Sequence, residues 1–226
     1  MSKRDELFDD WPEKYEQWFK TPIGSLVRRF ESDLVLDFLK PGPKESILDA
    51  GCGTGIFTLD LLLAGSRVVG LDISLPMLIR ANNKLGGSPF HPVSGDMNAL
   101  PFRDGFFDKT MSITALEFIQ DGKGAVAELF RVTKRGGVIV AATLNSLSPW
   151  ADRRREEAKK GHAIFSKAIF RSTDELRSLA PVEGVVRTAV HFQKGDPPER
   201  AVEVERESQR KGLQTGAFVA VRWLKP

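Results

Sequence analysis

The hydrophobic pattern of the chain alternates between two kinds of segment. Apolar residues recur at helical spacing in four segments, at residues 26–39, 56–65, 75–85 and 122–134. Shorter segments with strand character lie at residues 46–50, 67–72, 91–96, 107–113 and 137–143. Because strands repeatedly separated by helices are joined by right-handed crossovers, this order predicts a mostly parallel sheet with helices on both faces.

The pattern changes in the last third of the chain. A polar and basic segment at 151–171 precedes a short helix, whose start Ser172 or Thr173 can cap. Residues 184–192 and 216–224 have strand composition, and the charged segment between them gives no clear helical signal. Two strands joined without a crossover helix pair antiparallel. We therefore predict an α/β fold with a doubly wound, Rossmann-like sheet of seven strands, mostly parallel with an antiparallel last strand.

Composition and charge narrow the class of protein. With 226 residues, 41% hydrophobic and 28% charged, the chain matches one ordinary globular domain rather than a disordered or membrane protein. A formal net charge of +3 gives no argument for a nucleic-acid partner. A single cysteine, Cys52, excludes an internal disulfide and suits a reducing compartment. No membrane-length apolar run and no apolar signal region is present, so we expect a cytoplasmic protein with no membrane partner.

Three glycines follow the first predicted strand at alternating positions. In the sequence DAGCGTG, Gly51, Gly53 and Gly55 allow a sharp turn and a close approach of the backbone to a ligand. A dinucleotide loop has the spacing G-x-G-x-x-G, but Ile56 occupies the position of its third glycine. The carboxylate of Asp49 would also repel a pyrophosphate. The glycine spacing therefore argues against a dinucleotide.

A second acid, Asp72 in GLDIS, ends the second predicted strand, where a carboxylate can accept hydrogen bonds from both hydroxyls of a ribose. A ligand with a ribose and a cationic or zwitterionic group fits these acids. The segments ILDAGCGTG, GLDIS, GDMNALPFRDGFFD and RVTKRGGVIV together resemble the class I S-adenosylmethionine-dependent methyltransferases. The resemblance covers about residues 8–145 and is strongest to the small-molecule branch that includes the ubiquinone and menaquinone methyltransferases.

This resemblance implies S-adenosylmethionine as the cofactor. The three glycines then lie against its methionine and ribose, and Asp49 is oriented toward its ammonium group. Asp72 matches the ribose-binding acid and Ile73 the residue that packs on the adenine, while Asp96 accepts from the adenine amino group beside Met97. The cofactor-binding residues that we predict are Tyr15, Asp49, Gly51, Gly53, Gly55, Asp72, Ile73, Asp96, Met97 and Thr114.

The resemblance also implies a single methyltransferase domain over residues 1–226. Its expected parts are cofactor-covering helices (1–40), a cofactor-binding core (41–145), a substrate-side insert or lid (146–171) and the C-terminal part of the sheet (172–226). In the first part, Tyr15, Trp18 and Phe19 form one apolar helical face that suits packing. Tyr15 is also placed to contact the cofactor or the substrate.

Methyl transfer needs no nucleophilic triad, and we predict no metal site. The methyl group of a sulfonium is already activated, so transfer depends on in-line positioning and exclusion of water. A hydroxyl or carbon-acid acceptor requires a general base, and the candidates are His162, His191 and Glu117. We favour His162, which lies in the insert among aromatic residues. His191 suits a strand residue with a structural partner, Glu117 a solvated residue or a cap of the next helix, and the arginines at 153–155 a solvated helix face.

The segment after the fourth strand bears on the acceptor. It reads ITALEFIQ, whereas methyltransferases of DNA, RNA or protein glutamine amines carry an [Asn/Asp]-Pro-Pro-aromatic motif there. No basic stripe with interleaved aromatic residues indicates a nucleic-acid track. We therefore expect a small-molecule acceptor and no nucleic acid. Methyl transfer to a protein side chain and a non-catalytic protein that binds S-adenosylmethionine or S-adenosylhomocysteine stay open, as do a monomer and a homodimer.

Overall fold

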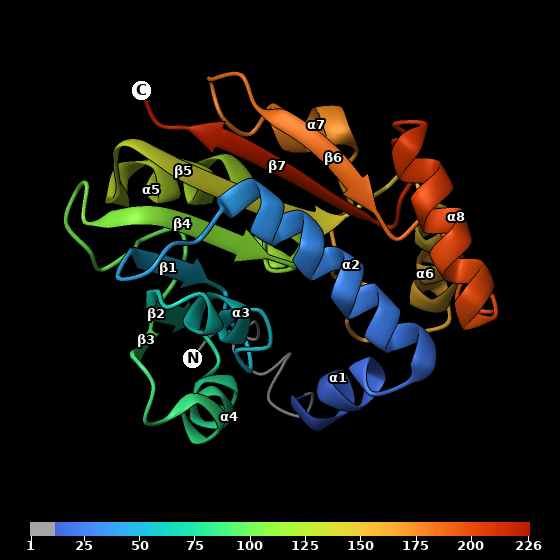
Figure 1. Ribbon diagram of the computed structural model, residues 1–226, viewed down its shortest axis with the longest axis horizontal. Coiled ribbons are helices and arrows are strands. Elements are labelled where there is room, and N and C mark those ends of the chain that lie inside the picture. Colours follow the sequence, from blue (N-terminus) through green and yellow to red (C-terminus); the bar gives the residue numbers. More distant parts are fainter. Residues whose placement is uncertain (1–11) are drawn as a thin grey trace.

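A seven-stranded sheet forms the centre of the molecule. The computed structural model describes residues 12–226, without the side chains at positions 12, 14 and 15. The strands are β1 (Ser46–Ala50), β2 (Arg67–Asp72), β3 (Phe90–Ser94), β4 (Phe107–Ile113), β5 (Thr133–Leu144), β6 (Val185–Ala189) and β7 (Phe218–Leu224). They follow the order β3-β2-β1-β4-β5-β7-β6 (Figure 1), with β7 antiparallel to both neighbours and the other pairs parallel. The predicted Rossmann-like sheet with an antiparallel last strand is confirmed.

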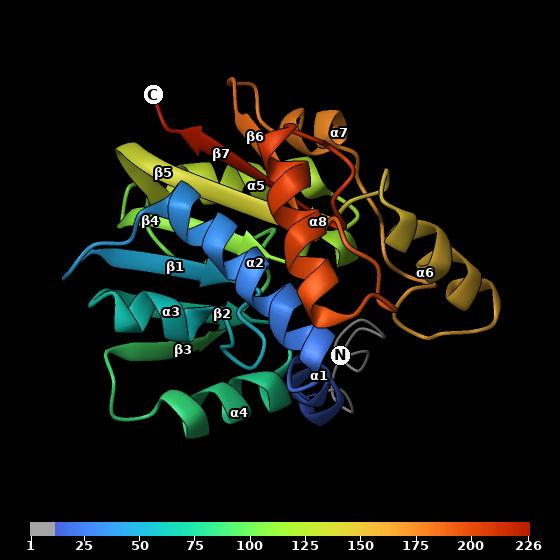
Figure 2. The same ribbon diagram turned by 45° about the vertical axis from the view of Figure 1, so that its right-hand side comes forward.

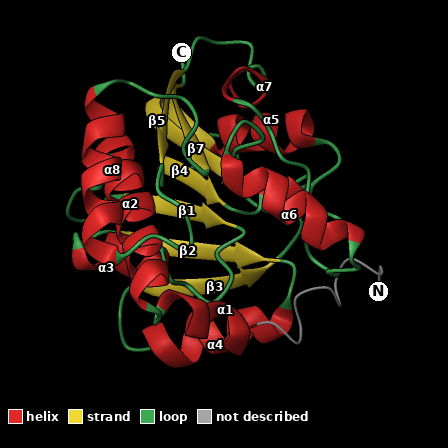
Figure 3. Cartoon of the chain, turned by 90° about the vertical axis from the view of Figure 1, so that its right-hand side faces the viewer, coloured by secondary structure: helices red, strands yellow, loops and turns green. Residues whose placement is uncertain are grey.

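Helices cover both faces of this sheet. They are α1 (Pro12–Phe19), α2 (Pro22–Leu39), α3 (Thr58–Leu63), α4 (Leu75–Leu85), the 3₁₀ helix η1 (Leu116–Phe118), α5 (Gly122–Val132), α6 (Pro149–Lys159), α7 (Thr173–Arg177) and α8 (Pro198–Arg210). Helices α2, α3 and α8 lie on one face, and α5 and α7 lie on the other (Figure 3). None of the helices in the described part of the chain combines the length and the apolar character that crossing a membrane requires.

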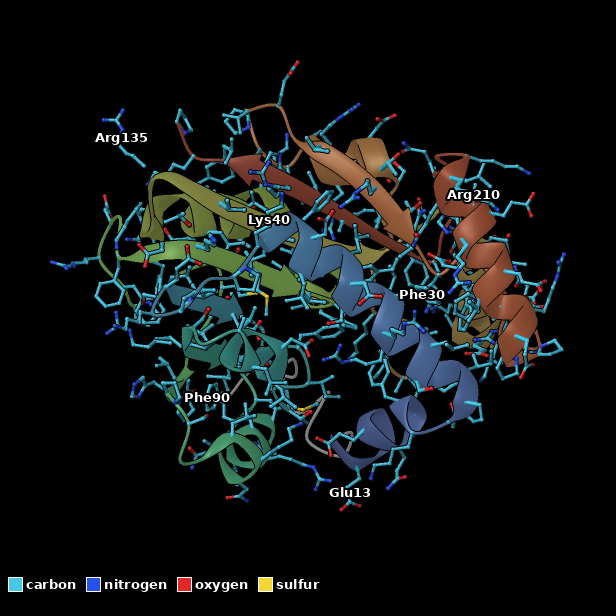
Figure 4. The ribbon with its side chains drawn as sticks, in the orientation of Figure 1. Glu13, Phe30, Lys40, Phe90, Arg135 and Arg210 are labelled. Carbon is cyan, nitrogen blue, oxygen red and sulfur yellow. The ribbon has the colours of Figure 1, made fainter. Side chains whose placement is uncertain are left out.

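The central strands are buried on both sides, which explains their nearly continuous apolar sequence. Consecutive residues Ile47 and Leu48 of β1 are both fully buried, yet they belong to separate apolar clusters on opposite faces of the sheet. On the α2 face, Phe30 packs against Phe192 with ring centroids 6.0 Å apart, and Figure 4 shows Phe30 on the side of α2 that faces α8. The sheet therefore holds its strand ends in fixed positions.

Local capping fixes where the helices around the strand ends begin. Ser74 accepts a hydrogen bond from the amide of Met77 at the start of α4, and Ser148 accepts one from Ala151 at the start of α6. At α7, the Ser172 side chain and the Glu175 side chain accept from each other's backbone amide, which completes a capping box. The predicted cap at Ser172 is confirmed.

The prediction of no helix between the last two strands is wrong. Helix α8 occupies most of that segment and packs against α2 and β6. Its buried positions are Ala201, Glu205 and Ser208, and beside them only the partly buried Val202 and Val204 pack on the core, so the apolar stripe in the sequence is narrow. The two strands are nevertheless antiparallel, because β7 returns between β5 and β6.

The polar segment after β5 also contains a helix. Helix α6 begins at Pro149 and extends past the edge of the sheet on the side toward which β1 and β4 point (Figure 2). Two hydrogen-bonded contacts join the residues after it to the core: the amide of Ile169 donates to the carbonyl of Glu117 over 2.7 Å, and Arg171 bridges to Asn145. The insert is thus fixed at the carboxyl ends of the strands.

Candidate active site

A cavity of about 860 Å³ lies beyond the carboxyl ends of β1, β2, β3 and β4. The loops that follow these strands line one part of it, and residues of α1, α2 and α6 line another. Trp18 of α1 and Trp150 of α6 both line the cavity and contact each other edge to face, with ring centroids 6.4 Å apart. Ligands bind at this edge of doubly wound sheets, so the cavity is the candidate active site.

Most of the predicted site residues line this cavity. They are Asp49, Gly51, Gly53, Asp72, Ile73, Asp96, Met97, Thr114 and His162. Gly55 does not line it. Tyr15 belongs to α1, but its side chain lies outside the described part of the structure, so its role stays a prediction.

The three glycines serve different purposes, although all have positive φ angles of 54–77°. A Cβ on Gly51 would lie 2.3 Å from the Cβ of Ala115, and one on Gly55 would lie 2.6 Å from Cδ1 of Leu85. A Cβ on Gly53 would meet no atom of the described residues within 4 Å. Gly51 and Gly55 thus allow close packing, whereas Gly53 presents bare backbone to open space.

Asp49 is buried beneath the glycine loop. Its Oδ2 accepts a hydrogen bond of 2.6 Å from Oγ1 of Thr58, and it is 2% exposed. Burial raises the pKa of Asp49 to about 7, the Thr58 hydrogen bond offsets part of this rise, and the charge of Asp72 adds to it.

Burial also raises the pKa of the Cys52 thiol far above its usual range, so this cysteine is a protonated, unreactive residue at neutral pH.

Asp72 holds the glycine loop against the end of β2. Its Oδ2 accepts from the amide of Gly53 over 2.8 Å, and its Oδ1 accepts from the amide of Ser74 over 2.9 Å. Burial raises the pKa of Asp72, while the hydrogen bonds from Ser74 and Gly53 lower it in part. The carboxylate is therefore oriented by the backbone before any ligand arrives.

The wall after β3 combines polar and apolar side chains. Asp96 is exposed, and its Oδ1 accepts from the amide of Asn98 over 2.8 Å. Met97 is buried, with its sulfur 3.7 Å from Oγ of Ser112, while Ile73 is 41% exposed on the cavity wall. An apolar side chain so exposed inside a cavity suits contact with a flat apolar ligand group.

The end of β4 is strained where it faces the cavity. Thr114 has a φ of +49°, an unusual conformation for a β-branched residue that costs about 1–3 kcal/mol. Its amide donates to the carbonyl of Ala142 over 2.9 Å, which holds the strained turn in place. The turn directs η1 into the cavity rather than along the strand.

The two interpretations proposed for Glu117 are both wrong. Glu117 is fully buried, so it is not solvated, and Asp121 caps the following helix α5 by accepting from Gly124. Glu117 lines the cavity, and neither of its carboxylate oxygens has a hydrogen-bond partner among the described residues. His191 has the structural partner expected of it, because its Nδ1 lies 3.1 Å from a carboxylate oxygen of Glu205, but it lies in the turn after β6 and not in the strand as predicted.

The sequence interpretation missed two charged side chains of the cavity wall. Glu31 of α2 is 6% exposed, and Arg154 of α6 has its Nη1 shielded from solvent without a described partner. The solvated face predicted for the arginines at 153–155 holds only for Arg155, which pairs with Asp152. The sequence contained a signal for this, because residues spaced three, four and seven positions apart share one face of a helix. On α6 these residues, which all line the cavity, are Trp150, Arg153, Arg154 and Glu157.

His162 lies on the same side of the cavity. Its ring stacks on Phe165 with centroids 4.3 Å apart, and its Nδ1 lies 3.4 Å from the amide of Phe165. The structure thus brings His162 to the cavity together with Glu31, Glu117 and Arg154.

Comparisons with known proteins agree with this geometry. A family described as "Methyltransferase domain" matches residues 48–141. A malonyl-[acyl-carrier protein] O-methyltransferase of Salmonella typhimurium is 35% identical over 187 residues, which cover 73% of this chain and 74% of the relative. A demethylmenaquinone methyltransferase of Renibacterium salmoninarum is 36% identical over 136 residues, which cover 60% of this chain and 56% of the relative. The chain spans about half the length of the first curated relatives that it matches.

A solved structure extends the likeness over nearly the whole chain. An S-adenosylmethionine-dependent methyltransferase from Thermotoga maritima, described as a possible histamine N-methyltransferase, superposes with a TM-score of 0.74 at 25% identity. The superposition covers 97% of this chain and 99% of the other. The matched family region runs from β1 into β5 and includes the glycine loop and the three acids at the strand ends. The chain belongs to the class I S-adenosylmethionine-dependent methyltransferases.

Proposed function

We propose that the chain transfers a methyl group from S-adenosylmethionine to a small-molecule acceptor by in-line displacement. One observation carries the proposal: a single cavity joins the glycine loop and its acids to a chamber beneath α6 lined by aromatic and charged side chains. A cavity of about 860 Å³ leaves room for the cofactor and a small second molecule.

The residues at the strand ends fit S-adenosylmethionine. Gly53 leaves its side of the loop open, so the methionine part of the cofactor can lie against bare backbone. Asp49, buried without a cation, would be ionised by the ammonium group of the ligand. Asp72, held by the Gly53 amide, would accept hydrogen bonds from the hydroxyls of the ribose, and Ile73 and Met97 would offer apolar contacts to the adenine ring.

The chain itself positions the two reactants and excludes water from them. The bound cofactor supplies a methyl group on a positively charged sulfur, which needs no further activation. Trp18, Trp150 and Phe165 enclose the chamber and keep water from the reacting atoms. We propose that the N-terminal helices and the insert at 146–171 form the cover of this site, with His162 facing the acceptor.

The class of acceptor is supported by the cavity and by the relatives. The cavity as a whole has a mostly apolar lining, which suits a small organic molecule more than an extended polymer. The relatives' names describe methylation of a malonyl group on a carrier protein and of demethylmenaquinone. We extend from them only the class of acceptor, a small organic group.

The test uses S-adenosylmethionine labelled in its methyl group. The purified protein is incubated with this cofactor and with the low-molecular-mass fraction of a cell extract, and the labelled products are identified by mass spectrometry. We expect a labelled small molecule together with S-adenosylhomocysteine. A parallel incubation with the macromolecular fraction tests transfer to protein side chains.

The outcomes separate the three candidate functions. Label in the macromolecular fraction alone would replace the small-molecule acceptor by a protein acceptor. Calorimetric binding of S-adenosylhomocysteine without transfer in either fraction would favour a non-catalytic binding protein. Failure to bind S-adenosylhomocysteine would contradict the cofactor assignment itself.

A further inference from the structure

Three ionisable side chains line the acceptor chamber, two of them buried and one half-buried, and two of the three have polar atoms without a hydrogen-bond partner among the described residues. Glu31 of α2, Glu117 of η1 and Arg154 of α6 come from separate elements and all line the cavity. Both carboxylate oxygens of Glu117 and Nη1 of Arg154 are shielded from solvent and have no hydrogen-bond partner in the described part of the chain. Buried polar atoms are almost always paired, so this set indicates a ligand that supplies the missing partners.

The three charges interact, but they do not pair with one another. The charge of Arg154 acts on both carboxyl groups through space, and no hydrogen bond or ion pair joins Arg154 to either one among the described residues. Buried carboxylates beside a guanidinium normally form direct ion pairs with it. Since all three groups face one cavity, a ligand group can bridge them, donating to the carboxylates and accepting from the guanidinium.

The surrounding contacts hold these groups in place. Arg171 donates from Nη1 to the carbonyl of Leu116 over 2.8 Å and from Nη2 to the carbonyl of Ile119 over 3.3 Å, which clamps both ends of η1. The guanidinium of Arg154 lies over the ring of Trp150 at 5.3 Å and of Phe165 at 5.9 Å. The positions of Glu117 and Arg154 are therefore fixed before an acceptor binds.

The raised pKa of Glu117 suits a side chain that accepts a proton during the reaction. Burial raises the pKa of Glu117 to about 7, although the nearby backbone amides of Glu117 and Leu144, and then the charges of Arg171 and Arg154, lower it in part. Burial raises the pKa of Glu31 to about 8. The charges of Arg154 and Arg28 lower the pKa of Glu31, and the charge of Glu117 raises it further. A carboxylate with such a pKa gains a proton readily at neutral pH.

We propose that Glu117 accepts the proton of the methyl acceptor, a mainly apolar molecule that presents a hydroxyl or amine hydrogen to Glu117 and a neighbouring oxygen to Arg154. The inference rests on the proposed function. The acceptor oxygen or nitrogen forms its bond to the methyl carbon as the sulfur–carbon bond breaks, with that electron pair left on sulfur. The hydrogen of the acceptor passes to Glu117, which becomes a neutral carboxylic acid.

Simple probes test the Glu117 part of the inference. Phenol, aniline and toluene have similar shapes, and only the first two donate a hydrogen bond. In protein saturated with S-adenosylhomocysteine, NMR titration should give at least tenfold tighter binding of phenol or aniline than of toluene. In Glu117→Leu the preference should fall below threefold, with unchanged affinity for S-adenosylhomocysteine. The stronger binder of the two shows whether a hydroxyl or an amine is the acceptor group.

A matched control and a second variant keep this test decisive. Glu157→Leu removes another carboxyl group of the cavity wall, one that pairs with Arg153, and should retain the preference. Glu117→Gln keeps the shape of the side chain but cannot take up a proton. This variant therefore tests the role of Glu117 if Glu117→Leu fails to fold. It should fold and bind S-adenosylhomocysteine normally, and with an identified acceptor kcat should fall by at least about 100-fold at pH 7.

Two results would overturn the role of Glu117. One is equal binding of the three probes, or no measurable binding of phenol and aniline, in the wild type. The other is a preference that persists in Glu117→Leu. The same probe titrations are repeated without S-adenosylhomocysteine. If only the proposed function fails, the protein does not bind S-adenosylhomocysteine, while the probes still bind with the expected preference.

The role of Arg154 is tested with 2-methoxyphenol, which adds an oxygen beside the hydroxyl group. The wild type should bind it at least threefold more tightly than phenol, and Arg154→Met should remove this gain. Arg155→Met, which alters the exposed arginine of the same helix, should keep it. A gain that is missing in the wild type or unchanged in Arg154→Met would overturn the assignment.

Discussion

At the scale of single residues, Asp72 connects the end of β2 to the glycine loop and faces the cavity. Because its carboxylate is held by two backbone amides, we expect Asp72→Ala to disturb the loop and remove the ribose partner together. Affinity for S-adenosylhomocysteine should fall by about 1.5–3 kcal/mol in calorimetry, the size of a lost charge-assisted hydrogen-bonding group.

A second aspartate provides the control for this measurement. Asp108 also accepts from a backbone amide, that of Ser46, and it pairs with Lys134 away from the cavity wall. Asp108→Ala should leave the affinity for S-adenosylhomocysteine unchanged. Equal losses in the two variants, or full affinity in Asp72→Ala, would remove the ribose assignment.

His162 and Glu117 compete for the role of proton acceptor. The stacked ring of His162 lines the cavity, so we expect His162→Ala to change turnover by less than about tenfold, because Glu117 takes the proton. Cofactor affinity should stay within twofold of the wild type in calorimetry. A loss of turnover of 100-fold or more in His162→Ala would return the role to the histidine.

At the scale of elements, α8 fixes the turn after β6. Glu205 is fully buried and accepts from the amides of Val190 and His191, at 3.1 and 2.6 Å, and from Nε2 of Gln209 at 2.8 Å. Val190 has a φ of +66°, so this carboxylate holds a strained β-branched turn beside the cavity. Burial opposes ionisation of Glu205, but the hydrogen bonds from His191 outweigh it and keep its pKa below the usual range.

We expect Glu205→Ala to lower the free energy of unfolding by about 3–5 kcal/mol, because two buried backbone amides lose their acceptor. Urea unfolding followed by circular dichroism measures the loss. On the same helix, Glu207→Ala removes an exposed pair with Lys211 and should leave the free energy of unfolding nearly unchanged. Similar losses for both variants would show that α8 acts only through its general packing.

Helix α8 also shows which features of the fold could not be predicted from the sequence. The strands and the helices α2 to α5 carry apolar faces, so their periodicity located them to within a few residues. Helix α8 buries an alanine, a glutamate and a serine, and its stability comes from partners that the local sequence does not reveal. That the residues after the strand ends line one cavity was predictable from the order of the strands, whereas Glu31 and Arg154 reach the cavity only through tertiary packing.

At the scale of the whole molecule, the cavity concentrates acids whose charged forms are disfavoured by burial. The pKa of Glu31 is raised to about 8 and those of Asp49 and Glu117 to about 7. Elsewhere, ion-paired acids such as Glu128 and Asp108 have lowered pKa values. The pKa values of the cavity acids are thus shifted in the opposite direction from those of the ion-paired acids elsewhere in the fold. Such a difference is expected where binding or catalysis, rather than stability, selects the residues.

This opposition predicts how stability depends on pH. A buried acid with a raised pKa stays protonated in the folded chain while the unfolded chain loses its proton, so its contribution disappears as the pH rises from about 4.5 to about 8. The acids with lowered pKa values act in the other direction and lose their contribution below about pH 4.5. Thermal stability without ligand should therefore be highest near pH 5–6 and fall toward pH 8.

Glu31→Gln isolates the largest of these contributions. An uncharged amide at this position should reduce the loss of unfolding free energy between pH 5 and pH 8 by on the order of 3 kcal/mol, at about 1.4 kcal/mol for each unit of pKa shift. Calorimetric melting at several pH values measures the difference, with Glu203→Gln on the exposed side of α8 as the control. An identical pH dependence in wild type and Glu31→Gln would mean that Glu31 is ionised inside the folded protein, and therefore that a cation or water already compensates it.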